Sequence, residues 1–146
     1  MWNRKNSVVL SLWACYIFGL ILTIAVAIFL FGDVGTVEQN LVFNLGFLAS
    51  ATFVYFALYG LIRLLLNIRK DKVFVRENVT YLRRISWDCF GVAAVAIVGG
   101  FLYHDLPITF FWLMAFIAAA IGLVLRVVKN VMEAAVELKA ENDLTV

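Results

Sequence analysis

Four long apolar runs constrain the fold of this chain more than any other feature of its sequence. They cover residues 8–31, 41–66, 87–103 and 106–125. The hydrocarbon core of a bilayer is about 30 Å thick, and roughly 20 apolar residues in helical form cross it. The runs do not alternate between apolar and polar residues, as the strands of a membrane barrel would. We therefore predict an all-α membrane protein with four transmembrane helices.

The composition of the chain favours the same class. Hydrophobic residues make up 64% of the sequence and charged residues 15%, and the mean hydropathy is +0.97. These values lie outside the range of soluble globular domains. Because most of the 146 residues belong to apolar runs, no segment remains that could bury a separate soluble core. We expect a single membrane domain that covers residues 1–146.

The basic residues predict the orientation of these spans. All twelve Lys and Arg residues lie before the first run, around the segment between the second and third runs, or after the fourth run. The opposite loops, residues 32–40 and 104–107, contain none. Lys and Arg close to membrane spans favour the cytoplasmic side. We therefore predict a multi-pass protein of the bacterial plasma (inner) membrane, with both termini and the loop 67–86 in the cytoplasm.

The N-terminal run has a second interpretation. Arg4 and Lys5 precede an apolar segment that contains Ala25 and Ala27, a pattern similar to that of a secretory signal peptide. The run nevertheless continues through Phe31 with no polar stretch at the would-be cleavage point. This favours an uncleaved first span, and cleavage would leave the sidedness of the other spans unchanged.

Two charged residues lie near the predicted cytoplasmic ends of the spans, where an ionisable side chain needs a partner or a route to water. Arg63 belongs to the second run and Asp88 to the third. Arg63 can snorkel to the headgroups, and Asp88 can reach Arg84 one helical turn earlier. The alternative is a pair between Arg63 and Asp88 that locks two helices together. Both interpretations are structural.

Small residues recur at a spacing of four within the runs, which lets helix backbones approach closely. The pairs are Gly46 and Ser50, Ala96 and Gly100, Ala115 and Ala119, and Ala118 and Gly122. They favour a compact four-helix bundle whose last two helices form an antiparallel hairpin. The sequence leaves open whether copies of the chain form a homo-oligomer.

Residue patterns that would carry catalysis or bind a cofactor are absent from the sequence. His104 is the one histidine and adjoins Asp105 in a short turn, while Cys15 and Cys89 belong to separate runs. The sequence has no Cys-x-x-Cys pair, no Gly-rich phosphate loop and no carboxylate pair deep in a span. We expect a protein that is not an enzyme, with no metal site and no cofactor. A proton-driven carrier is disfavoured for the same reason.

The loop 67–86 carries six basic and two acidic residues. Within it, Val79, Leu82 and Ile85 recur at helical spacing, and Arg76, Arg83 and Arg84 lie elsewhere around the same helix. This pattern is typical of a short amphipathic helix in the headgroup region. We predict a membrane-surface helix that contacts anionic lipid headgroups. Docking of a partner protein is the alternative use of this loop.

The tail, residues 126–146, continues the last apolar run without Pro or Gly. One face carries an apolar stripe of Val127, Val131, Ala135 and Leu138, and Lys129, Glu133, Glu137 and Glu141 follow one another a turn apart. A helix from about residue 108 to residue 141 would extend roughly 20 Å beyond the hydrocarbon. We predict that it enters the cytoplasm and stops at a left-handed Asn142. Because an anionic membrane repels an acidic stripe, the pattern favours a protein partner.

The loop and the tail carry a family resemblance. FVRENVTYLRRI (74–85) and LRVVKNVMEAAVELKAENDLTV (125–146) are similar to motifs of the domain-of-unknown-function family numbered twenty-nine seventy-five, which contains small bacterial integral membrane proteins. The resemblance covers essentially the whole chain, and the closing ENDLTV is its most specific part, although Ala140 replaces an acid usual in the family. The resemblance implies a membrane protein often encoded beside a Cro/CI-type helix-turn-helix repressor. It implies no catalytic residue and no mechanism.

Two functions follow from these observations. The first is a regulatory membrane anchor that binds a cytoplasmic helix-turn-helix regulator and has no direct contact with nucleic acid. Its predicted partner-binding residues are Glu133, Glu137, Glu141, Asn142, Asp143, Leu144 and Val146. The second is a small transport or immunity-type membrane protein, in which the helices act on ions, peptides or lipids and the tail stabilises assembly.

Overall fold

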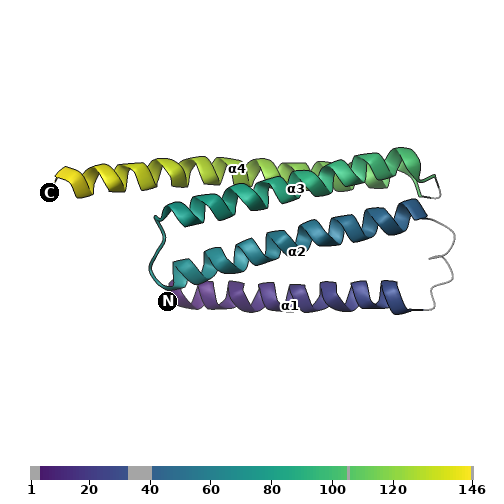
Figure 1. Cartoon of the computed structure of the whole chain (residues 1–146), viewed down its shortest axis with the longest axis horizontal. Helices are drawn as coiled ribbons and strands as arrows, with labels where there is room; N and C mark the ends of the chain where they lie inside the picture. The colour runs from purple at the N-terminus through teal and green to yellow at the C-terminus, as the bar shows by residue number, and fades with distance from the viewer. Residues whose placement is uncertain (1–3, 33–40, 105, 146) are drawn as a thin grey trace.

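The computed structural model describes residues 4–32, 41–104 and 106–145, and within them the chain is all-helical (Figure 1). The helices are α1 (Arg4–Phe31), α2 (Leu41–Arg69), α3 (Arg76–Leu102) and α4 (Ile108–Thr145). Each is long and apolar enough to cross a membrane, so the predicted class of a four-helix, multi-pass chain is confirmed. Asp105 and Val146 lie outside the described residues.

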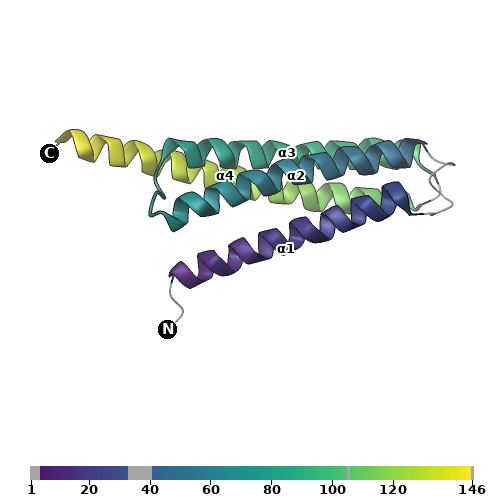
Figure 2. The same ribbon diagram turned by 60° about the horizontal axis from the view of Figure 1, so that its bottom comes forward.

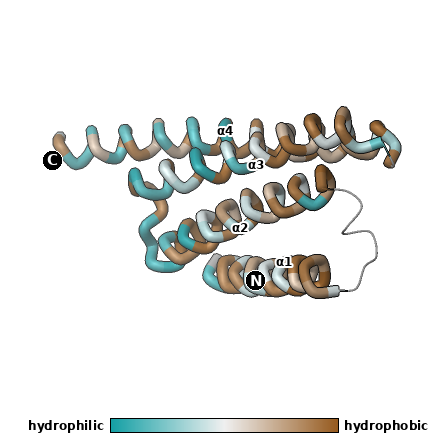
Figure 3. The backbone as a smooth tube through the Cα atoms, turned by 45° about the vertical axis from the view of Figure 1, so that its right-hand side comes forward, coloured by the Kyte–Doolittle hydropathy of each residue, from teal (hydrophilic) through white to brown (hydrophobic). Residues whose placement is uncertain are grey.

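Successive helices run in opposite directions, so the start of α1 and the end of α4 lie at the same end of the molecule (Figure 1). We call this the basic end. It comprises the start of α1, the connection between α2 and α3, and the far part of α4. Polar residues concentrate there, whereas the remainder of each helix is mainly hydrophobic (Figure 3).

The helices form an open, curved row and not the compact bundle that the small residues predicted. Within the described chain, close backbone approaches join α1 to α2, α2 to α3 and α3 to α4, and no such backbone approach joins α1 to α3 or α4. Figure 2 shows α1 leaning away from the α3–α4 pair. Lipid tails are as apolar as a protein interior, so the outer faces of α1 and α4 need no protein cover in a bilayer.

Several small residues do serve close packing, as their spacing predicted. A Cβ added at Gly100 would lie 3.0 Å from Phe111, and one added at Gly122 would lie 3.3 Å from Cys89. The Ser86 hydroxyl, which is buried, donates to the Gly122 carbonyl at 2.8 Å. Because glycine brings the two backbones this close, a side chain of α3 can bond directly to the main chain of α4.

The two ends of the connection between α2 and α3 are determined by backbone geometry. Asp71 adopts a left-handed conformation with a φ of 60°. The amides of Asp71 and Lys72 donate back to the carbonyls of Ile68 and Asn67 at 3.1 and 2.9 Å, which is the hydrogen-bond pattern of a Schellman motif. The motif ends α2, and α3 begins after the extended Val75.

The prediction of a left-handed stop at Asn142 was wrong. The helix α4 continues to Thr145, whose hydroxyl donates to the Asn142 carbonyl at 3.0 Å. Asn tolerates the left-handed conformation but does not impose it. Since residues 143–145 contain neither Pro nor Gly, nothing in this stretch forces the chain out of the helix.

The predicted membrane-surface helix is instead the first turns of α3. Val79, Leu82 and Ile85 are only 3%, 3% and 5% exposed, because α2 and α4 pack against α3 from two sides. Ile85, for example, covers Gly60 of α2. The three basic residues Arg76, Arg83 and Arg84 are exposed. The apolar face of this segment therefore contacts protein. Val79, Leu82 and Ile85 leave almost no surface that lipid could contact.

Candidate functional site

The far part of α4 is the clearest candidate for a docking surface. The antiparallel partner α3 begins at Arg76, and α4 runs on alone beyond that point (Figure 1). Every residue from 137 to 145 is exposed. We call residues 134–145 the projecting end; at 1.5 Å per residue it is about 18 Å long.

Glu133 lies just before the projecting end and is already paired within the protein. Its carboxylate contacts the Lys129 ammonium at 3.0 Å, and the side chain is 33% exposed. The hydrogen bond and charge of Lys129 lower the pKa of Glu133, with Arg83 and Arg76 of α3 adding to the effect. The predicted stripe of three equivalent glutamates is therefore uneven, because Glu133 faces the basic start of α3.

The other predicted partner-binding residues within the described chain are open to solvent. Glu137, Glu141, Asn142, Asp143 and Leu144 are all exposed, and Val146 lies outside the described residues. The exposed fraction is 66% for Val131, 60% for Leu138 and 87% for Leu144. A solvated helix that combines exposed acids with exposed aliphatic side chains has the composition of a helix that docks into a groove.

A buried amide cluster, which sequence reasoning missed, holds the α2–α3 connection in place. Asn78 is 0% exposed. Its amide nitrogen donates to the carbonyls of Lys72 and Val73, each at 2.8 Å, and its oxygen accepts from the Asn67 amide at 2.9 Å. Asn78 and Ser86 share the helix face of Leu82 and Ile85, so their helical spacing was a signal that two polar side chains lie on the apolar face.

The pair between Arg63 and Asp88, which the sequence offered as an alternative, does not form. Arg63 Nε donates to the Tyr81 hydroxyl at 3.2 Å, and its guanidinium lies 3.9 Å from Glu77. The register explains the choice, since Gly60 packs against Ile85 and antiparallel α2 then brings Arg63 beside Tyr81. The Oδ2 atom of Asp88 is buried and has no hydrogen-bond partner among the described residues.

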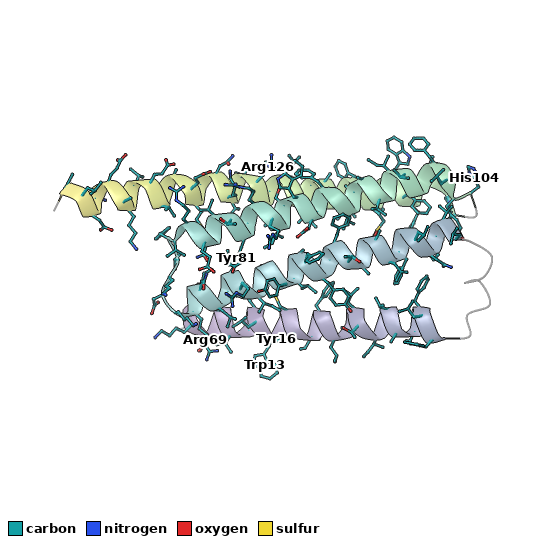
Figure 4. The ribbon with its side chains drawn as sticks, in the orientation of Figure 1. Trp13, Tyr16, Arg69, Tyr81, His104 and Arg126 are labelled. Carbon is teal, nitrogen blue, oxygen red and sulfur yellow. The ribbon has the colours of Figure 1, made fainter. Side chains whose placement is uncertain are left out.

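A cation–π contact joins α3 to α4 near the basic end. The Arg126 guanidinium lies 4.9 Å from the Trp87 ring centre and 5.8 Å from that of Phe90. Trp87 is 59% exposed, as expected of an aromatic residue at a membrane interface. Figure 4 shows Arg126 at the middle of α4. The contact indicates that the polar part of α3 and α4 begins close to Trp87 and Arg126.

Two of the cavities in the described part of the chain lie between helices. The larger, about 390 Å³, has an apolar lining that comes from all four helices, including Leu22, Gly46, Gly99 and Met114. Tyr103 and Phe111 also line it and pack edge to face with ring centres 6.1 Å apart. The smaller, about 210 Å³, lies between α1 and α2 at the basic end; it is lined by Val9, Leu12, Trp13, Tyr16, Leu66 and Arg69.

The histidine and the two cysteines do not form a cluster with other metal-ligand side chains among the described residues. His104 is exposed and lies at the end opposite the basic end (Figure 4). Cys15 is buried, Cys89 is half-buried, and both are free thiols. Within the residues that the structure describes, no three His, Cys, Asp or Glu side chains gather as metal ligands would.

Comparison with known proteins places the chain among membrane proteins of undetermined activity. The family described as "Protein of unknown function (DUF2975)" matches residues 3–146. The "Uncharacterized membrane protein YoaS" of Bacillus subtilis (strain 168) is 26% identical over an alignment that covers 99% of each chain. No solved structure matches significantly. Because the family match runs nearly from end to end, this four-helix membrane chain belongs to the DUF2975 family.

Proposed function

We propose that this protein is a non-enzymatic membrane anchor that holds a cytoplasmic helix-turn-helix regulator through the projecting end of α4. The observation that carries the proposal is that every residue from 137 to 145 is exposed, on a part of α4 that extends beyond the other helices (Figure 1). A helix that served only to span the membrane would not need this extension. A regulator held there would be kept away from its operator.

The chemistry of the projecting end supports a basic partner. It carries three acidic side chains and one basic one, Lys139. Exposed Leu138 and Leu144 offer apolar anchors beside Glu137 and Glu141. DNA-binding proteins need basic surfaces for phosphate, and such a surface complements an acidic helix. The partner class itself comes from the family resemblance.

The sidedness of the membrane supports the same proposal. All Lys and Arg residues of the chain belong to the basic end or to the helix turns next to it. The positive-inside tendency therefore favours the cytoplasm for this end, and a bacterial plasma membrane for the protein. The projecting end would then stand in the compartment that contains DNA and its regulators.

The test is recovery of the purified regulator encoded beside this gene by the detergent-solubilised protein. We expect Glu137→Lys with Glu141→Lys to abolish recovery and leave membrane insertion intact, because both side chains are exposed. Removal of residues 142–146 should weaken recovery. Recovery by the unaltered protein should also fall at high salt, because salt screens exposed charges.

A matched control separates docking from simple charge attraction. Exchange of two residues, Glu137→Lys with Lys139→Glu, keeps the net charge and rotates one acid to another helix face. We expect this variant to lose most recovery, although its total charge is unchanged. Equal recovery by the unaltered, charge-reversed and truncated proteins would remove the anchor proposal.

The second candidate is the small transport or immunity-type protein, and one observation favours it. The 390 Å³ apolar cavity is more than twice the size of an engineered cavity of about 150 Å³ that binds benzene. A lipid chain or another hydrophobic molecule fits such a site better than an ion does. Retention of activity against such a molecule after truncation of the projecting end would promote this candidate.

A further inference from the structure

The smaller cavity, at the basic end between α1 and α2, has the chemistry of a lipid headgroup site. Its polar side chains are Trp13, Tyr16 and Arg69, which supply an indole N–H, a hydroxyl and a guanidinium. No carboxylate is among the described residues that line the cavity. We propose that it binds one anionic phospholipid of the adjoining leaflet, with the headgroup phosphate at Arg69 and an acyl chain along the apolar lining.

Arg69 is available for an anion. It is exposed at the last turn of α2, and it makes no ion pair with any residue that the structure describes. Lys5, Lys70 and Lys72 are exposed at the same end. The connection between α2 and α3 contains one acidic residue, Asp71, so the basic residues outnumber the acidic ones there. A guanidinium favours phosphate because its planar fork of donors matches two phosphate oxygens.

The aromatic and apolar residues of the cavity indicate what the ligand carries besides an anionic group. Trp13 and Tyr16 are 64% and 54% exposed and lie with Arg69 toward the basic end (Figure 4). Trp and Tyr prefer the headgroup level of a membrane. Leu12 is only 5% exposed and forms part of the lining with Val9 and Leu66. A ligand with a charged head and an apolar chain satisfies both halves of this surface, whereas a free inorganic anion satisfies one.

The volume agrees with partial enclosure of a lipid. About 210 Å³ is less than the 300 to 1,000 Å³ typical of pockets that enclose a drug-sized molecule. It suffices for a headgroup and the first part of a chain, and the remainder of the lipid would stay in the bilayer. Basic pockets between membrane helices on the cytoplasmic side are a known setting for anionic headgroups.

The experiment measures lipids retained by the full chain released from nanodiscs of equal phosphatidylglycerol and phosphatidylethanolamine, by native mass spectrometry. We expect one retained phosphatidylglycerol, enriched over phosphatidylethanolamine. Arg69→Gln should lower its occupancy at least about tenfold, because a charge-assisted hydrogen bond is lost. Tyr16→Phe should lower it less, and circular dichroism will show whether each variant is folded.

Lys70→Gln is the matched control, because it removes the same charge one residue away from the cavity. We expect it to change occupancy less than about threefold. If Arg69→Gln and Lys70→Gln lowered the lipid occupancy equally, the lipid would be held by diffuse charge attraction and not by a site at Arg69. This result would overturn the proposal. Displacement of the lipid by inorganic phosphate would overturn it too, by assigning the site to a small anion. Absence of any enrichment would have the same consequence.

Discussion

Replacement of Asn78 by Ala should destabilise the protein strongly, although Asn78 belongs to none of the proposed binding surfaces. The side chain is 0% exposed and makes three hydrogen bonds, to the carbonyls of Lys72 and Val73 and from the amide of Asn67. Each such bond contributes a net of about 0.5–1.5 kcal/mol, and its partners, which are only partly buried, would lose their bonds as well. We expect a loss of about 2–4 kcal/mol in the free energy of unfolding.

Two further variants make this prediction specific. Asn78→Asp keeps the shape of the side chain but removes both N–H donors and sets a carboxylate against two carbonyl oxygens, so it should cost at least as much as Asn78→Ala. Asn130→Ala is the matched control, since Asn130 is exposed on α4 and Ala is the better helix former. It should be neutral or slightly stabilising.

The assay is reversible denaturant unfolding in detergent micelles, followed by circular dichroism, with hydrogen exchange of residues 70–75 as a local readout. Loss of the Asn78 bonds should speed exchange in this connection before the rest of the protein opens. Unfolding free energies for Asn78→Ala and Asn130→Ala that agree within about 0.5 kcal/mol would refute the reasoning, because they would show that the buried amide holds nothing together.

The other predictions concern packing and pH. Gly91→Ala places a Cβ 2.8 Å from the Phe53 ring and should cost about 1–3 kcal/mol in thermal or denaturant unfolding, whereas Gly19→Ala, with nothing within 4 Å, should be neutral or stabilising. The pKa of Glu133 is lowered from 4.5 by Lys129, so its contribution to stability is present above about pH 4.5 and is lost as the pH falls through the lower, folded-state pKa. Glu133→Gln should remove this acid-dependent part of the stability profile, and an unchanged profile would contradict the pairing.

The helices could be predicted from sequence because bilayer thickness acts on each apolar run independently of the others. The same holds for Gly100 and Gly122, whose small size permits close approach whatever the partner is. What covers a helix face is a different question. The spacing of Val79, Leu82 and Ile85 shows that one face is apolar, but lipid tails and protein interior satisfy that face equally well. The sequence therefore could not distinguish a membrane-surface helix from a buried one.

The partners of the charged side chains depend on register, which periodicity does not contain. A shift of about two turns between α2 and α3 would bring Arg63 from Tyr81 to Asp88. Contacts such as that of Gly60 with Ile85 fix the register instead beside Tyr81. The acids of the tail show the same limit. Glu133 and Glu137 are equivalent in spacing, yet only Glu133 lies level with the basic start of α3.

Sidedness of the projecting end tests the central claim most directly, because an anchor for a cytoplasmic regulator requires this helix in the cytoplasm. In a variant with Cys15 and Cys89 replaced by Ala, single cysteines can replace Glu141 and, at the opposite end, His104, both of which are exposed. A membrane-impermeant maleimide added to intact cells should label the cysteine at position 104 at once, and the cysteine at position 141 only after the membrane is permeabilised. Labelling of position 141 in intact cells would contradict the account.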